Sequence, residues 1–126
     1  MRKIDKHIIH CSDTSDDSNV TVEMIREWHK ERGWSDIGYH FVILRNGNIM
    51  KGREVEKIGA HCKGYNANSI GTCLVGRFSF NEEQIKSLQN LHRILQNTFP
   101  DITIHGHNEF NNKKTCPNFN VKKYIN

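Results

Sequence analysis

The sequence contains no uninterrupted run of about 20 apolar residues, the length that a helix needs to cross a bilayer. Its first seven residues are mostly charged and lead directly into a short apolar run. They lack the longer apolar region and the small-residue cleavage site of a secretory signal. These absences predict a protein that is made and kept in the cytoplasm, without a membrane partner, unless another agent releases it.

Two further absences limit the partners and the redox chemistry. No block of five or more lysines and arginines occurs, and the formal net charge is only +4, so we expect no nucleic-acid partner. The mild positive charge is compatible with an anionic polymer such as bacterial cell wall. No pair among the four cysteines has the Cys-x-x-Cys spacing, and in a cytoplasmic protein we expect thiols or metal ligands rather than disulfides.

Short apolar runs alternate with helical patterns along the 126 residues, which suffice for one domain with a real core. The apolar runs predict strands at residues 3–10, 39–44, 48–50, 70–76 and 101–105. Asn46-Gly47 is a hairpin signal, and Thr21 and Asn81 are candidate N-caps of two amphipathic helices, the first of which ends at Gly33. This order predicts a single α/β domain over residues 1–126, with a central mixed β-sheet flanked by helices.

Three residues far apart in the sequence have the side chains of a zinc site: His10, His107 and Cys116. Three protein ligands leave one coordination position for water, which is the arrangement of a catalytic rather than a structural zinc ion. If the first and last strands are parallel neighbours, both imidazoles emerge at one edge of the sheet. From the residues alone, His7 and His105 remain rivals of the two histidines.

A set of short motifs occurs in a fixed order along the chain. In chain order the set comprises His10-Cys11-Ser12, Trp28-His29, Gly33-Trp34, Gly38-Tyr39-His40-Phe41, Gly59-Ala60-His61, Asn68-Ser69-Ile70-Gly71, Leu74-Val75-Gly76, Gly106-His107 and Lys114-Thr115-Cys116-Pro117. With this set the chain resembles the zinc-dependent N-acetylmuramoyl-L-alanine amidases, in particular the small phage amidases called lysozymes. These amidases share a fold with the peptidoglycan recognition proteins. The resemblance extends from about residue 4 to about residue 125.

The resemblance assigns roles to particular residues. It implies that His10, His107 and Cys116 bind one zinc ion per chain. Tyr39 and Lys114 match the family's catalytic tyrosine and lysine, although the neighbouring Lys113 leaves the register of the lysine open. His61 matches a histidine that lines the substrate groove.

The resemblance also implies the reaction, which is hydrolysis of the amide between the lactyl group of N-acetylmuramic acid and L-alanine in bacterial peptidoglycan. We therefore expect a monomeric endolysin of phage or prophage origin that reaches the cell wall after release. One alternative is a non-catalytic peptidoglycan-binding protein, but loss of the cysteine ligand usually marks that state and Cys116 is present. Another is an amidase with an added polymerase-binding regulatory role. One departure from the small phage amidases that the chain resembles is Asn108, where they carry a second histidine after the histidine that corresponds to His107.

Overall fold

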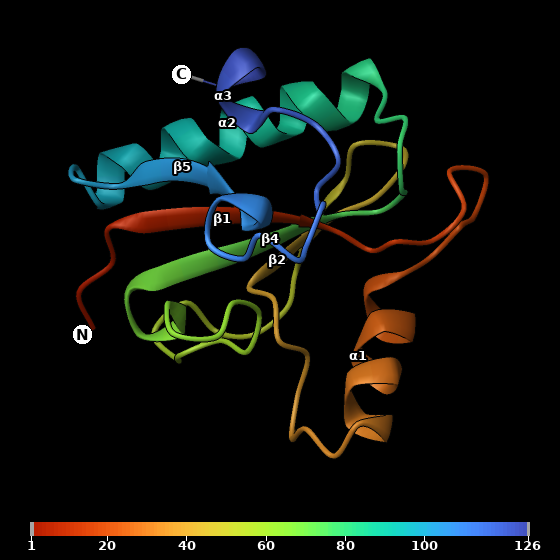
Figure 1. Cartoon of the computed structure of the whole chain (residues 1–126), viewed down its shortest axis with the longest axis horizontal. Helices are drawn as coiled ribbons and strands as arrows, with labels where there is room; N and C mark the ends of the chain where they lie inside the picture. The colour runs from red at the N-terminus through yellow and green to blue at the C-terminus, as the bar shows by residue number, and fades with distance from the viewer. Residues whose placement is uncertain (1, 126) are drawn as a thin grey trace.

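The computed structural model describes residues 2–125, which form one five-stranded sheet in the order β3-β2-β4-β1-β5 (Figure 1). The strands are β1 (Lys6–Cys11), β2 (Phe41–Ile43), β3 (Ile49–Lys51), β4 (Ser69–Leu74) and β5 (Thr103–Gly106). Strand β1 runs parallel to both β4 and β5, β2 runs parallel to β4, and β3 pairs antiparallel with β2 at one edge. The predicted mixed α/β sheet is confirmed.

Helices lie on both faces of the sheet. They are α1 (Val22–Glu31), α2 (Glu82–Thr98) and α3 (Val121–Tyr124), with the 3-10 turns η1 (Asn66–Asn68) and η2 (His107–Glu109). Helices α2 and α3 lie above the sheet in Figure 1 and α1 lies on the opposite side, and each side has its own buried apolar cluster. Among residues 2–125, no helix is long and apolar enough to cross a membrane.

The predicted helix and turn signals are present. The Thr21 hydroxyl accepts a hydrogen bond from the backbone N–H of Met24, which satisfies one of the free donors at the start of α1. Asn81 and Gln84 form a reciprocal capping box at the start of α2. Gly47 has φ +89° in the β2–β3 hairpin, a conformation that side chains other than glycine rarely adopt.

Strand β2 (Phe41–Ile43) is shorter than the predicted strand 39–44 at both ends. His40 is fully buried; its Nδ1 accepts from the backbone N–H of Gly71 at 3.0 Å, and its Nε2–H therefore donates to the Lys57 carbonyl at 2.8 Å. His40 thus ties the chain before β2 to β4. Tyr39, one residue earlier, precedes the strand and lines the same pocket as His10, His107 and Cys116.

Candidate active site

The pairing of β1 with β5 brings the three predicted ligands together. Ile9 of β1 lies opposite Gly106, the last residue of β5, so His10 and His107 follow at the same end of two parallel strands. Their ring centroids are 4.5 Å apart. The loop after η2 returns with Cys116, and one ligand atom from each of the three residues lies within 4.8 Å of the others. Two imidazole nitrogens and one sulfur at this spacing fit a single zinc ion.

Both rival histidines are engaged elsewhere. His7 lies fully buried, with Nε2 at 2.7 Å from the Thr72 hydroxyl and its ring stacked on His92. His105 forms a hydrogen bond from Nδ1 to the Glu109 carboxylate at 3.0 Å. In one continuous strand, His105 and His107 would lie on the same side. Strand β5 ends at Gly106, however, and His107 begins η2.

The surroundings of the cluster suit metal ligands. Burial lowers the pKa of both His10 and His107, for the latter together with the nearby charge of Lys114, so both imidazoles are neutral near pH 7 and keep a free lone pair. The backbone N–H of Cys11 donates to Cys116 Sγ at 3.0 Å, a contact that stabilises negative charge on the sulfur. The pKa of Cys116 is raised, mainly by the hydrogen bond with the Cys11 thiol and secondly by burial. A metal ion that binds the sulfur must therefore displace the thiol proton.

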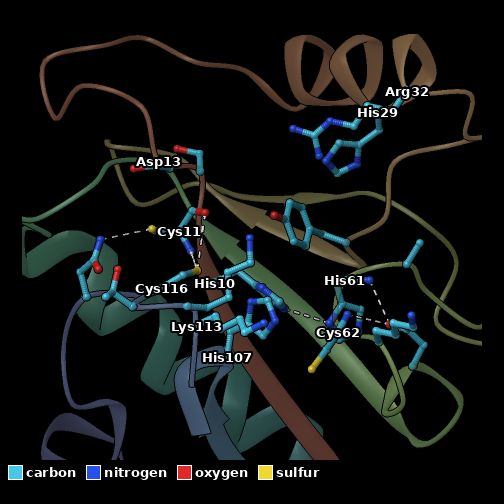
Figure 2. Close-up of a pocket in the computed structure, with 18 of the residues that line it drawn as sticks. His10, Cys11, Asp13, His29, Arg32, His61, Cys62, His107, Lys113 and Cys116 are labelled. Carbon is cyan, nitrogen blue, oxygen red and sulfur yellow. Dashed lines mark hydrogen bonds between the residues drawn. The ribbon is translucent and has the colours of Figure 1, made fainter. Parts of the chain in front are cut away.

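His61 contacts a ligand directly. Its Nδ1 lies 2.9 Å from Nε2 of His10 (Figure 2). Its Nε2 lies 3.2 Å from the Ser69 hydroxyl. The contact with His61 engages Nε2 of His10, so Nδ1 of His10 is the ring nitrogen left for a metal ion. The His61 ring lies flat against β4, since a Cβ added at Gly71 would come within 2.5 Å of it.

Tyr39 and the two lysines line the same pocket as the cluster. The Tyr39 ring centroid is 5.1 Å from that of His10, and burial raises the pKa of the phenol, which therefore stays protonated. Lys113 and Lys114 both line the pocket, and the charge of Lys114 lowers the pKa of His107. That effect favours Lys114 as the ammonium nearer the cluster.

The pocket has a volume of about 590 Å³ and includes residues that the sequence reading missed. His29, to which the sequence analysis assigned no role, is buried and lines the pocket with Arg32, on the α1 side of the view in Figure 2. Its Nδ1 accepts from the backbone N–H of Gly38 at 2.9 Å, and burial lowers its pKa to about 4. The signal that could have found it is helical spacing, since His29 follows Val22 and Ile25 on the buried stripe of α1.

This fold and site define a class shared by amidases and peptidoglycan recognition proteins. The chain is similar to the solved N-acetylmuramoyl-L-alanine amidase LysC from Clostridium intestinale, with a TM-score of 0.88 and 30% identity over 99% of this chain and 88% of that one. It is also similar to Drosophila PGRP-LB, with a TM-score of 0.83 and 27% identity over 98% of this chain and 79% of that one.

Sequence comparison identifies the family. The family described as N-acetylmuramoyl-L-alanine amidase matches residues 1–119. The endolysin of Escherichia phage T7 is 41% identical over 128 aligned positions, which cover 95% of this chain and 84% of the phage protein. The chain belongs to the N-acetylmuramoyl-L-alanine amidase family, and the predicted resemblance is confirmed.

Proposed function

We propose that this family member is a zinc-dependent endolysin that hydrolyses the amide between the lactyl group of N-acetylmuramic acid and L-alanine. The observation that carries the proposal is the convergence of His10, His107 and Cys116, with ligand atoms within 4.8 Å of one another, on a pocket that Tyr39 and Lys114 also line. An open three-ligand site beside a hydrogen-bond donor and a cation is suited to amide hydrolysis.

His10, His107 and Cys116 would hold the zinc ion. When bound, zinc would supply a Lewis acid and lower the pKa of a coordinated water toward about 7. The neutral imidazoles of the two histidines need lose no proton to act as ligands. The N–H of Cys11 supports the negative charge that the Cys116 sulfur carries as a ligand.

Tyr39 and Lys114 have the chemistry that the rest of the reaction needs. Hydrolysis of an amide places negative charge on the former carbonyl oxygen and requires a proton for the leaving amine. The protonated phenol of Tyr39 can donate a hydrogen bond to that oxygen, to the attacking water or to the amine. The ammonium of Lys114 stabilises the developing negative charge, an effect worth about 3 kcal/mol for one well-placed donor.

The same proposal covers the remaining properties of the protein. Residues 1–126 act as one catalytic domain and as a monomer, with peptidoglycan as the partner and no role for nucleic acid. His61 lines the groove as well as contacting His10, a dual role supported by its position in the pocket. The enzyme is made in the cytoplasm of a cell that carries a phage or prophage, and acts on the wall after release.

The test is digestion of purified cell wall with metal-depleted protein and with the same protein after addition of one equivalent of zinc. We expect new free amino termini on alanine only with zinc, and no new reducing sugar ends. Reducing ends without new amines would indicate a glycosidase. Binding to the wall with no released product in either condition would indicate a non-catalytic receptor.

A further inference from the structure

A second thiol lies against the proposed cysteine ligand. Cys11 follows His10 at the end of β1, and its thiol is hydrogen-bonded to that of Cys116. The Cys116 sulfur also lies 3.0 Å from the backbone nitrogen of Cys11 and 3.9 Å from its carbonyl oxygen (Figure 2). The proposed hydrolysis makes no use of the Cys11 thiol, so a nucleophilic group beside the metal cluster is left without a task.

The two cysteines are close enough for a disulfide bond. A backbone nitrogen is joined to its own Cα by a bond of about 1.46 Å, so the Cys116 sulfur lies within about 4.5 Å of the Cys11 Cα. A disulfide has sulfurs about 2.05 Å apart and places each of them within about 4.5 Å of the partner's Cα. The two sulfurs can therefore meet through rotation of their side chains.

Neighbouring segments fix the backbone of both cysteines. Cys11 pairs with Leu74 in the register of β1 and β4. The backbone N–H of Asn108 donates to the Cys116 carbonyl at 2.9 Å. The side-chain amide of Asn118 donates to the Cys11 sulfur at 3.8 Å. The fold therefore holds the two thiols together although they are 105 positions apart in the sequence.

Small oxidants in the solvent have access to this pair. Cys11 and Cys116 both line the pocket of about 590 Å³, and Cys116 is partly exposed. Cys73, by contrast, is fully buried and does not line the pocket. When one thiol of a contacting pair is oxidised to a sulfenic acid, the second thiol condenses with it before further oxidation occurs. The pair therefore has the arrangement of a redox-sensitive site.

We propose that Cys11 and Cys116 form a redox switch, in which hydrogen peroxide converts the two thiols into a disulfide and so removes a ligand from the metal site. One sulfur breaks the O–O bond and takes up one oxygen as a sulfenic acid, with release of water. The other sulfur then displaces that oxygen as a second water and forms the S–S bond. Two electrons pass from sulfur to oxygen, and both thiol protons end in water.

The disulfide and a metal ion compete for the same sulfur. Zinc binds the thiolate form of cysteine, which Cys116 loses in a disulfide. Oxidation leaves only His10 and His107 of the three proposed ligands, and a reductant restores the third. This regulatory effect rests on the proposed zinc amidase function, whereas formation of the disulfide requires neither zinc nor hydrolysis.

The first experiment uses the metal-free full chain and no substrate. After treatment with hydrogen peroxide, free thiols are counted and cross-linked peptides are mapped by mass spectrometry. We expect the four free thiols of the wild type to fall to two, with one Cys11–Cys116 cross-link that a reductant cleaves. The control Cys62→Ser removes a thiol that lines the same pocket outside the pair, and should form the same cross-link.

Two variants test the need for the second thiol. Cys11→Ser and Cys11→Ala should form no cross-link to Cys116, and agreement between them excludes an effect of one misfolded variant. A cross-link of Cys116 to Cys62 or Cys73 would overturn the proposal. So would a wild-type protein in which Cys116 is oxidised to sulfinic acid, or not oxidised, without a cross-link.

The second experiment measures control of the metal site. Zinc-loaded wild type, Cys62→Ser and Cys11→Ser are treated with peroxide while a chromogenic indicator reports released zinc. We expect the first two to release about one zinc per chain and to lose at least about tenfold of their own untreated wall-digesting rate. A phosphine reductant with added zinc should restore that rate. Cys11→Ser should release zinc about tenfold more slowly, because the intramolecular thiol is missing.

The outcomes separate the switch from the proposed function. A cross-link with loss of zinc, in a protein that digests no wall before treatment, supports the switch and sinks only the amidase proposal. Wall digestion by a protein that keeps its zinc and rate, under conditions that cross-link the metal-free chain, overturns the switch alone. Equal rates of zinc release from wild type and Cys11→Ser would also overturn it.

Discussion

Nε2 of His10 lies 2.9 Å from Nδ1 of His61, so a metal-ligand candidate on β1 is oriented by a histidine from the loop before η1. The backbone N–H of His61 donates to the Asn66 side chain at 2.9 Å, which fixes that loop. Hydrogen bonds of this kind hold the tautomer and the ring orientation of a histidine that binds a metal.

We expect His61→Ala to weaken zinc binding by about 10- to 100-fold, because His10 loses the partner that orients its ring. Competition with a chelating indicator measures the zinc affinity directly. Lys63→Ala, an exposed position in the same loop, is the matched control and should retain wild-type affinity. Unchanged zinc affinity combined with weaker substrate binding would limit His61 to a groove role.

Cys116→Ser should abolish zinc retention at equimolar metal, since a serine hydroxyl does not supply the anionic sulfur ligand. Metal content after gel filtration is the measurement. Cys62→Ser is the control, because Cys62 is a free, buried thiol outside the three-residue cluster. If the Cys116 variant keeps both its zinc and its wall-digesting rate, the ligand set is wrong.

Lys114→Ala should lower kcat about 100-fold while zinc stays bound, because one donor to the developing negative charge is lost. Lys113→Ala is the matched control and should have a much smaller effect. The reverse result would assign the catalytic role to Lys113. Turnover of a muramyl peptide and metal content of each variant, measured together, distinguish these outcomes.

Acid should destabilise the metal-free protein. Burial lowers the pKa of His40 to about 4, from an unfolded value near 6.5. Below pH 6.5 the unfolded chain takes up a proton that the native state excludes, so the free energy of unfolding falls until the pH reaches about 4. The full loss from His40 is about 3 kcal/mol, and His29 acts in the same direction.

Urea denaturation at pH 7 and pH 5 measures this acid effect. His40→Asn should show a smaller difference between the two pH values than wild type, because its side chain does not titrate in this range. Equal stability of the wild-type protein at both pH values would contradict the expectation.

Local patterns predicted the elements well. The caps at Thr21 and Asn81, the Asn46-Gly47 hairpin and the buried stripe of α1 depend on residues within one or two turns of each other. Such interactions can be read from spacing alone. Local patterns did not show that β2 begins only after Tyr39, because this depends on two long-range hydrogen bonds of His40. Its ring accepts one from the backbone N–H of Gly71 and donates one to the Lys57 carbonyl.

Local sequence patterns could not predict the contacts between segments that are distant in the sequence. The His61–His10 pair requires that position 71 carry no Cβ, which becomes evident only when β4 lies beneath the His61 ring. Likewise, Phe78 is a large apolar residue of the kind usually found in a core, but it is 72% exposed in a loop whose backbone N–H groups donate to Asp16. In both cases the deciding partner is distant in sequence.

The sequence by itself determined the chemistry available to this protein: two imidazoles and a thiol of the kind that bind metal ions, a phenol, a lysine, and the helix and turn signals that order the fold. The tertiary structure decided which of these groups meet. Parallel pairing of β1 with β5 brings His10 beside His107. His105 is not part of this cluster, because its ring is hydrogen-bonded to the Glu109 carboxylate. The physical reason is that residue type sets what an atom can donate or bind, whereas strand pairing across about 100 residues sets its neighbours.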